Sequence, residues 1–193
     1  MIIFSLDTNF VIPRIMHEGK RNTQFNQLDY MLLLEKKGLI KICLPDSTQA
    51  EIYAVLRAGR YPIKSNGKKI FYPFPHEQIM RRVRRYSEIF DMKFLESFKE
   101  IDFKEGVGYK EVLFRNMKYI LGMDIHQSIE WIENRGIDVE NYKDDYDFHI
   151  MVATLQCNAD YLVTNNIDDF PNPLGKCEVI TSKELPKKLP IYP

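Results

Sequence analysis

Short apolar runs alternate along this chain with longer segments of helical periodicity, and this alternation restricts the folds that the chain can adopt. The runs IIFSLD, GLIKICLP, ADYLVT and KCEVIT, at 2–7, 38–45, 159–164 and 176–181, combine β-branched and apolar residues as buried strands do. Strands that alternate with helices form a parallel sheet with helices on both faces. The sequence therefore predicts an α/β fold.

Helical periodicity fills most of the chain between these runs. Helices are expected at about 24–35, from Asp46 onward, at about 76–98, at about 109–135, and from Asp144 or Asp145 to about Leu155. The segment 59–75 is rich in Gly, Pro and Lys, which indicates a long loop or a short hairpin around Asn66-Gly67. At 193 residues, the chain is expected to be one domain, 1–193, with a mainly helical insertion at about 59–136.

The composition argues against a membrane or secreted protein. Nothing in the chain approaches a run of 18 apolar residues, so no membrane span is expected. The first residues, MIIFSLD, lack the basic lead and the cleavage site of a secretory signal. Cys43, Cys157 and Cys177 are an odd, widely spaced set, which favours reduced residues of a cytoplasmic protein over disulfides or a zinc site.

The formal net charge is zero, but the charges are unevenly distributed. Nine basic residues lie between Arg57 and Arg85, against Glu77 alone. Five acidic residues lie between Asp138 and Asp147, against one lysine. This polarity suits a polyanionic ligand held by one region and attacked at another, and it also fits two solvated faces of opposite sign.

Four motifs place an acidic residue where an apolar element starts or stops. Asp7 ends the first strand, Asp169 lies in the loop after the third strand, and Glu51 and Asp147 lie near the starts of helices. Ligands of parallel sheets bind beyond the carboxyl ends of the strands, and the helices return from that same edge. We therefore expect these four carboxylates to converge at one edge of the sheet.

Several carboxylates within a few Å of one another repel strongly unless a cation lies among them. Mg²⁺ or Mn²⁺ is the simplest such cation, and it would supply hydrolytic chemistry. Each acid also has an ordinary alternative: Asp7 as a turn former or helix cap, Glu51 as a solvated helix residue, Asp147 as a helix N-terminal charge, and Asp169 as a loop acid. Their order and their shared apolar context favour the metal site.

The chain resembles the PIN-domain family. The matching motifs are DTN at 7–9, the segment from Pro45 to Glu51 that opens a helix, the helix from Asp147 to Leu155, and ADYLVTNN followed by DF at 159–170. The resemblance covers the first ~57 and the last ~50 residues and is weakest in the middle. It implies an αβα sandwich around a central parallel sheet and a metal-dependent ribonuclease, such as the VapC-type toxin of a toxin–antitoxin pair.

The resemblance also implies roles for individual residues. Asp7, Glu51, Asp147 and Asp169 would be catalytic, and Asp7, Asp147, Asp169 and Asn166 would be metal ligands. Asn166 stands where many family members have Asp, which bears on a second metal more than on the first. Thr8, Asn9 and Thr164 are expected to orient the carboxylates, or else to act as turn and strand-end caps.

The implied reaction is attack by water on a phosphodiester, in line, which leaves a 5′-phosphate and a 3′-hydroxyl. Single-stranded or loop RNA is the expected substrate, because the scissile strand must be accessible. An antitoxin protein and a second copy of the chain are further partners that the family implies. The basic residues would hold the RNA, with Tyr61, Phe71, Tyr72 and Phe74 either stacking on bases or packing the insertion; they are Arg57, Arg60, Lys68, Lys69, Arg81, Arg82, Arg84 and Arg85.

Three other interpretations were weighed. A haloacid-dehalogenase-like phosphatase needs a second Asp two residues after the first, where this chain has Asn9. A receiver-type signalling domain needs an adjacent acidic pair after the first strand, which the sequence lacks. The third is a catalytically weakened PIN fold that serves as an RNA-binding or protein-interaction module, with Asn166 as a mark of lost activity.

Overall fold

The computed structural model describes residues 1–16, 23–65, 68–92, 122–139 and 147–191. The chain divides into two compact units. Unit 1 comprises Met1–Pro45 and Ile125–Pro193, and unit 2 comprises Asp46–Asp124. The expectation of one domain with an insertion at about 59–136 stays a prediction. The expected helix at 109–135 lies partly outside the described residues, which include only α6 (Ile125–Glu133) from it.

Unit 1 is built on a parallel sheet, which confirms the predicted α/β class. The strands are β1 (Ile2–Leu6), β2 (Ile40–Cys43), β5 (Tyr161–Thr164) and β6 (Glu178–Thr181). Their order is β2-β1-β5-β6, and each neighbouring pair is parallel. The inner strands are the most apolar, and Phe4, Leu6 and Leu162 are fully buried. Each of the four strands falls within an apolar run that the sequence marked.

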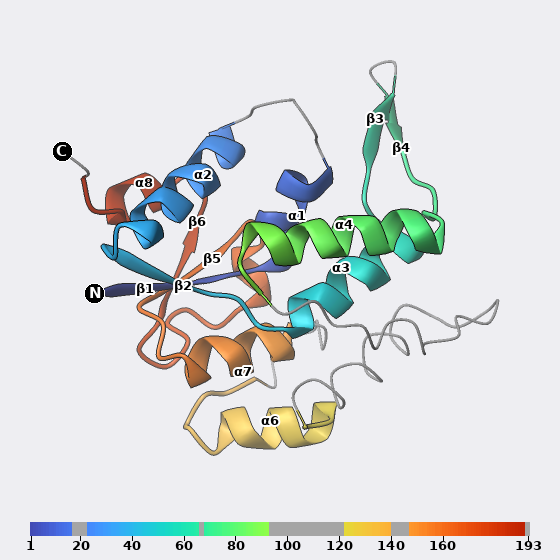
Figure 1. Ribbon diagram of the computed structural model, residues 1–193. Helices are drawn as coiled ribbons and strands as arrows, with labels where there is room; N and C mark the ends of the chain where they lie inside the picture. The colour runs from blue at the N-terminus through green and yellow to red at the C-terminus, as the bar shows by residue number, and fades with distance from the viewer. Residues whose placement is uncertain (17–22, 66–67, 93–121, 140–146, 192–193) are drawn as a thin grey trace. The chain divides into compact units, whose positions relative to one another are not determined.

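The order of the strands assigns the helices to the two faces of the sheet. From β1 to β2 the chain passes through α1 (Thr8–Met16) and α2 (Thr23–Lys36), and it returns to β5 through α7 (Phe148–Gln156). These two connections run in opposite directions across the sheet. Since crossover connections are right-handed, opposite directions place their helices on opposite faces. Figure 1 shows α2 and α7 on opposite sides of the strands, which is compatible with a three-layer sandwich.

The helix α7 lies deep in unit 1. Its residues from Phe148 to Thr154 are all buried, as expected for a helix that is apolar nearly all round. The helix α6 packs against it on one side. On the other side the Thr154 hydroxyl donates to the Ser5 hydroxyl of β1 at 2.8 Å, and both residues are fully buried. This bond ties the last turn of α7 to β1.

The connections that follow β1 and β5 run in opposite directions across the sheet. The chain leaves β1 toward β2 on one side and leaves β5 toward β6 on the other. The carboxyl ends of two such neighbouring strands form the usual ligand position of an open parallel sheet. In this chain the residues at that position are Asp7, directly after β1, and Thr164 with Asn165, at the end of β5. The topology therefore indicates a ligand site at these side chains.

Unit 2 contains α3 (Ser47–Arg57), a hairpin of β3 (Ile63–Ser65) and β4 (Lys68–Ile70), and α4 (His76–Ile89). The two strands are antiparallel, which confirms the hairpin alternative for this segment; the turn at 66–67 lies outside the described residues. The helices α3 and α4 pack together. The helix α4 ends at Ile89, and the chain turns at Asp91 with a φ of 50°. The rest of the helix predicted at about 76–98 falls on residues 93–98, which lie outside the described residues.

None of the helices in the described part of the chain has the length and apolar character that crossing a membrane requires.

Candidate metal centre

Asp7 is held by backbone hydrogen bonds on both sides. Its amide donates to the Val163 carbonyl of β5 at 3.0 Å, so it extends the pairing of β1. Its own carbonyl accepts the amides of Phe10 at 3.0 Å and Val11 at 3.3 Å, which open α1. Asp7 is thus the junction between a strand and a helix, and only 2% of its surface is exposed. A side chain on such a junction has little freedom to move.

The Asp7 carboxylate is oriented by two donors. The Thr164 hydroxyl donates to Oδ2 at 2.6 Å, and the backbone amide of Asn9 donates to Oδ1 at 3.2 Å. Thr164 Oγ1 in turn accepts Asn9 Nδ2 at 3.2 Å and the Asn166 amide at 2.9 Å. Because a hydroxyl has one proton and two acceptor positions, these contacts commit its proton to Asp7. Asp7 is therefore the acceptor of this bond.

Asn9 and Asn165 join the ends of β1 and β5. The Asn165 amide donates to Asn9 Oδ1 at 2.9 Å, and Asn165 Nδ2 donates to the Asn9 carbonyl at 3.1 Å. Asn9 therefore contacts Asp7, Thr164 and Asn165 at once, which supports the orienting role predicted for it and for Thr164. Asn165 was not among the predicted site residues. The sequence feature that could have indicated it is the TNN triplet at the end of the third strand, in which Asn165 directly follows Thr164.

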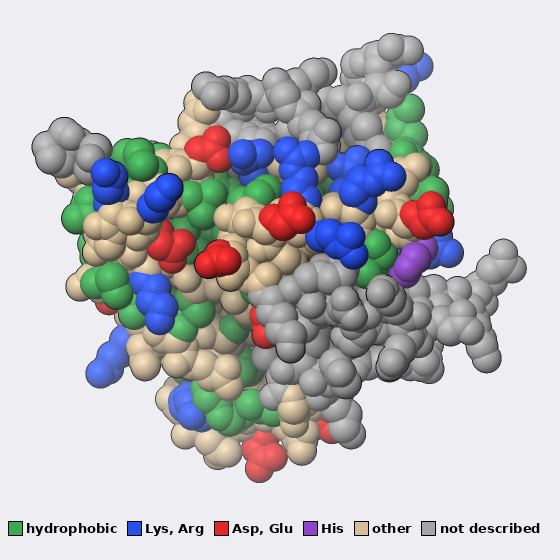
Figure 2. Space-filling model, in the orientation of Figure 1, with side chains coloured by type: hydrophobic (Ala, Val, Ile, Leu, Met, Phe, Trp, Pro, Cys, Tyr) green, Lys and Arg blue, Asp and Glu red, His purple; other side chains and the backbone are tan. Residues whose placement is uncertain are grey.

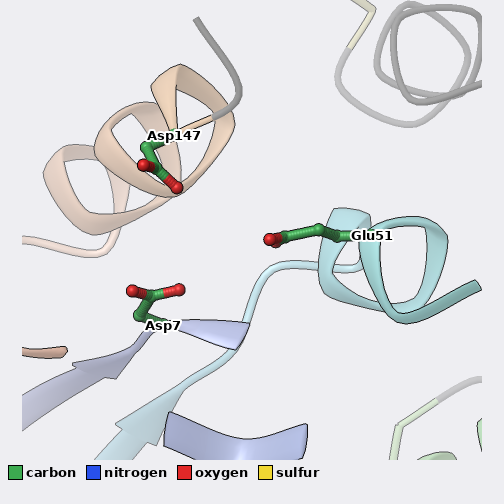
Figure 3. A group of neighbouring side chains, drawn as sticks. All are labelled: Asp7, Glu51 and Asp147. Carbon is green, nitrogen blue, oxygen red and sulfur yellow. The ribbon is translucent and has the colours of Figure 1, made fainter. Parts of the chain in front are cut away.

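Asp147 faces Asp7 from the start of α7. It occupies the N-cap position and is 9% exposed, and its side chain makes no capping hydrogen bond to the helix as described. One carboxylate oxygen of Asp147 lies within 4.8 Å of one of Asp7, and Figure 3 shows the two side chains pointing toward each other. Two like charges at this separation repel by about 3 kcal/mol at an effective dielectric constant near 20. A cation between them removes that penalty.

Glu51 lies in unit 2, in the second turn of α3, and is 8% exposed. The whole start of this helix is buried, from Ser47 through Ala54. The Asp46 carbonyl accepts the backbone amide of Gln49 at 3.1 Å, and the Asp46 side chain makes no capping hydrogen bond to α3. Asp7, Glu51 and Asp147 are three buried acidic residues that could hold a metal ion (Figure 3). Carboxylate oxygens are the donors that Mg²⁺ and Mn²⁺ prefer.

The other predicted ligands lie in the loop after β5, outside this acidic group. Asn166 is exposed, and its described contact with the site is the bond from its backbone amide to Thr164 Oγ1. Asp169 is half-buried at the end of the short 3₁₀ helix η2 (Ile167–Asp169), and its amide donates to the Asn166 carbonyl at 3.2 Å. Thr8 is buried as the first residue of α1. The roles of these three side chains stay predictions.

The eight basic residues predicted to bind RNA all belong to unit 2. Arg81 and Arg84 are exposed on α4, opposite the buried stripe of Ile79, Val83 and Tyr86. Figure 2 shows Lys and Arg side chains gathered over the surface that α4 occupies, with acidic side chains among them. The other six are the exposed Arg60, Lys68 and Lys69 and the half-buried Arg57, Arg82 and Arg85.

The aromatic residues of unit 2 fall into two groups. Phe74 is 2% exposed, with the guanidinium carbon of Arg82 5.5 Å from its ring centroid, so it packs rather than stacking on bases. Tyr61 is half-buried, and burial raises its pKa to about 12. Phe71 and Tyr72 are 60% and 42% exposed. Only these two of the four have the exposure that stacking on a nucleic-acid base requires.

Comparison with protein-family models, with curated proteins and with solved structures finds no match for this chain. The chemistry of the site must therefore be argued from its own residues. Asp7 is acidic, buried and oriented, and it lies where an open parallel sheet holds its ligands.

Proposed function

We propose that this chain is a PIN-like, metal-dependent endoribonuclease whose carboxylates Asp7, Glu51 and Asp147 hold Mg²⁺ or Mn²⁺. The observation that carries the proposal is the pair formed by Asp7 and Asp147, which are 2% and 9% exposed and have oxygens within 4.8 Å of each other. Buried like charges are unfavourable unless a cation or a proton compensates them. Glu51 is the third carboxylate that the proposal adds to them.

The donor set fits a hard divalent cation better than zinc or a redox metal. The three side chains offer oxygen atoms alone, whereas zinc sites usually contain His or Cys. His149 follows Asp147 closely in the sequence but is fully buried within α7, and the group of possible ligands among the described residues does not include it. A divalent cation bound here would polarise a phosphate oxygen and lower the pKa of a bound water.

Each residue of the site has its own role in the proposed reaction. Asp7 and Asp147 would hold the cation together with Glu51, and Thr164 and Asn9 keep the Asp7 carboxylate in one orientation. Glu51 would also position the water that attacks the phosphodiester in line, or a second ion, and this attack would leave a 5′-phosphate and a 3′-hydroxyl. Burial of all three carboxylates limits the access of bulk water and strengthens their interaction with the cation.

RNA is the substrate class that the proposal names. A polyanion needs compensating positive charge, and the exposed Lys68, Lys69, Arg81 and Arg84 of unit 2 offer it. The exposed rings of Phe71 and Tyr72 can stack on unpaired bases, which favours single-stranded or loop RNA over a duplex. A VapC-type role with an antitoxin protein, and a homodimer, are further parts of the proposal that follow from the family resemblance.

A catalytically weakened module for RNA or protein binding is the second candidate. One observation favours it: Asn166 replaces an acid in the loop after β5 and is exposed, and Asp169 is not in the buried acidic group of the described residues. A site with fewer carboxylates binds its cation less tightly. This candidate predicts RNA affinity without cleavage.

Cleavage of a mixed RNA pool separates the two candidates. The full chain is incubated with Mg²⁺, with Mn²⁺ and with EDTA, and the new ends are mapped. The proposal predicts metal-dependent products with 5′-phosphates, lost in Asp7→Asn and retained in Asp168→Asn, an exposed acid of η2 outside the acidic group. RNA binding without products, or products that EDTA leaves unchanged, would overturn it.

A further inference from the structure

Cys43 and Cys157 are far apart in the sequence but both belong to unit 1. Cys43 ends β2, and Cys157 is the C-cap residue of α7. In the register of the sheet, Ser5 of β1 is paired with Cys43. Residues paired across neighbouring strands project from the same face of a sheet. Cys43 therefore projects from the face that carries the Ser5 side chain.

That face is the one covered by α7. The Thr154 hydroxyl of α7 donates to the Ser5 hydroxyl at 2.8 Å. Cys157 lies three residues beyond Thr154, about one helical turn, so both side chains lie on the same side of α7. The Cys157 thiol also approaches the Thr154 carbonyl at 3.4 Å. The helix contact and the sheet register thus place Cys157 near Cys43, and each of the two thiols shifts the pKa of the other.

We propose that Cys43 and Cys157 are a redox-active dithiol that hydrogen peroxide converts into a reversible disulfide between β2 and α7. The sequence predicted reduced cysteines with no disulfide, and all three are free thiols in this structure. Spacing in the sequence did not indicate that two of them lie near each other. Both side chains are partly exposed, so a small oxidant can reach them. The inference is independent of the proposed nuclease function.

The surroundings of the two thiols indicate which of them reacts first with peroxide. Interaction with Cys43 lowers the pKa of Cys157, and interaction with Cys157 together with burial raises the pKa of Cys43. Lys41 lies two residues before Cys43 on β2, so its charge is on the same face and favours a thiolate. Cys157 is therefore the thiol that reacts first, and Cys43 is its resolving partner.

The chemistry balances with peroxide as the two-electron oxidant. The Cys157 thiolate attacks one peroxide oxygen, the O–O bond breaks, and with one proton taken up a sulfenic acid and a water molecule form. The Cys43 sulfur then attacks the Cys157 sulfur, the S–O bond breaks, and a second water leaves with the Cys43 proton. A dithiol reductant reverses the conversion and is itself oxidised to a disulfide.

Cys177 supplies an internal control. It is 3% exposed, just before β6, and burial raises its pKa to about 12. A protonated, buried thiol reacts slowly with peroxide. The proposal therefore excludes Cys177 from the disulfide, although its sulfur is close enough to Cys157 to sense its charge.

The test treats the folded, reduced full chain with hydrogen peroxide, blocks the remaining thiols by alkylation, and maps the peptides by mass spectrometry without reduction. The expected product links the Cys43 peptide to the Cys157 peptide, leaves Cys177 alkylated, and disappears after dithiothreitol. A linkage that includes Cys177, or three alkylated thiols after treatment, would overturn the proposal.

Three matched variants sharpen the result. Cys177→Ser should form the same disulfide at the same rate, and Cys43→Ser should stop at a sulfenic acid on Cys157 that dimedone traps. Cys157→Ser should lose the fast reaction with peroxide. Equal rates for all three variants would contradict the assigned order. Because the bond would close more than half of the chain into a loop, oxidation should also raise the Tm of the Cys177→Ser variant, by about 5 °C or more; an unchanged Tm would show that the bond does not tie β2 to α7.

Discussion

The acidic side chains of unit 1 and the basic side chains of unit 2 differ in how far they are exposed and in how firmly they are held. Asp7 and Asp147 are at most 9% exposed, and Asp7 is fixed by donors from Thr164 and Asn9. The basic residues of the β4 hairpin strand and of the outer face of α4 are exposed. Burial and orientation make a group specific for one small ligand, whereas exposed charges attract a polyanion without fixing it. The comparison therefore predicts that the buried acids carry the chemistry and that the exposed basic residues attract the RNA.

Removal of one buried acid is expected to have the largest effect. Asp147→Asn keeps the shape of the side chain and removes one charge from the cation site. We expect metal-dependent cleavage to fall by more than about 100-fold, beyond the loss that follows removal of an orienting partner. Initial rates at saturating RNA measure it. Activity within a few-fold of the wild type would show that the acids do not form the reactive site.

Removal of the donor that orients Asp7 should have the next largest effect. Thr164→Val is nearly isosteric, but it deletes the hydroxyl that donates to Asp7 Oδ2 and accepts from Asn9 and Asn166. Loss of such a partner typically lowers metal affinity by about 10- to 100-fold. Titration with Mn²⁺ measures the affinity, and Thr181→Val at the end of β6 is the control. Equal affinities for the two variants would contradict the orienting role.

Removal of exposed positive charge should act on RNA binding alone. The double variant Lys68→Ala, Lys69→Ala removes two exposed charges from β4. The salt dependence of RNA affinity should become shallower by about 1.4, since each phosphate contact to a single strand contributes about 0.7 to the slope. Fluorescence anisotropy over a range of salt concentrations measures it. Affinity for Mn²⁺ should not change, and a change would mean that the two regions are not separable.

The smallest effect is expected for an acid outside the buried group. Asp168 is exposed in η2, adjacent to Asp169. Asp168→Asn should leave the cleavage rate and the Mn²⁺ affinity within about 2-fold of the wild type, because exposed charges are screened by solvent and salt. Asp169→Asn, measured in parallel, determines whether the loop after β5 contributes a ligand. A loss confined to Asp169→Asn would bring this residue into the site.

The sequence located the sheet edge well because strand ends are set by short-range signals. A β-branched run that ends in Asp7 specifies both the strand and its polar end, and the run that ends in Thr164 does the same. The parallel order then brings these two ends together. Asp7 and Thr164 could therefore be predicted as neighbours from the sequence.

Other features could not be predicted because they depend on contacts between distant residues. The double hydrogen bond between Asn165 and Asn9 requires the exact register of β5 on β1. The placement of Cys157 near Cys43 requires the height of α7 above the sheet, to which the bond from Thr154 to Ser5 contributes. Periodicity alone carries no information on register or height. A loop acid such as Asp169 is the hardest to place, since neither periodicity nor pairing fixes its side chain.

Binding of Mn²⁺ to the full chain tests the central claim most directly, because it needs neither RNA nor turnover. Isothermal titration of the wild type should give a saturable site, and Asp7→Asn combined with Asp147→Asn should abolish it, with folding confirmed by circular dichroism. Asp168→Asn should bind as the wild type does. A folded double variant that retained wild-type Mn²⁺ affinity would contradict the account.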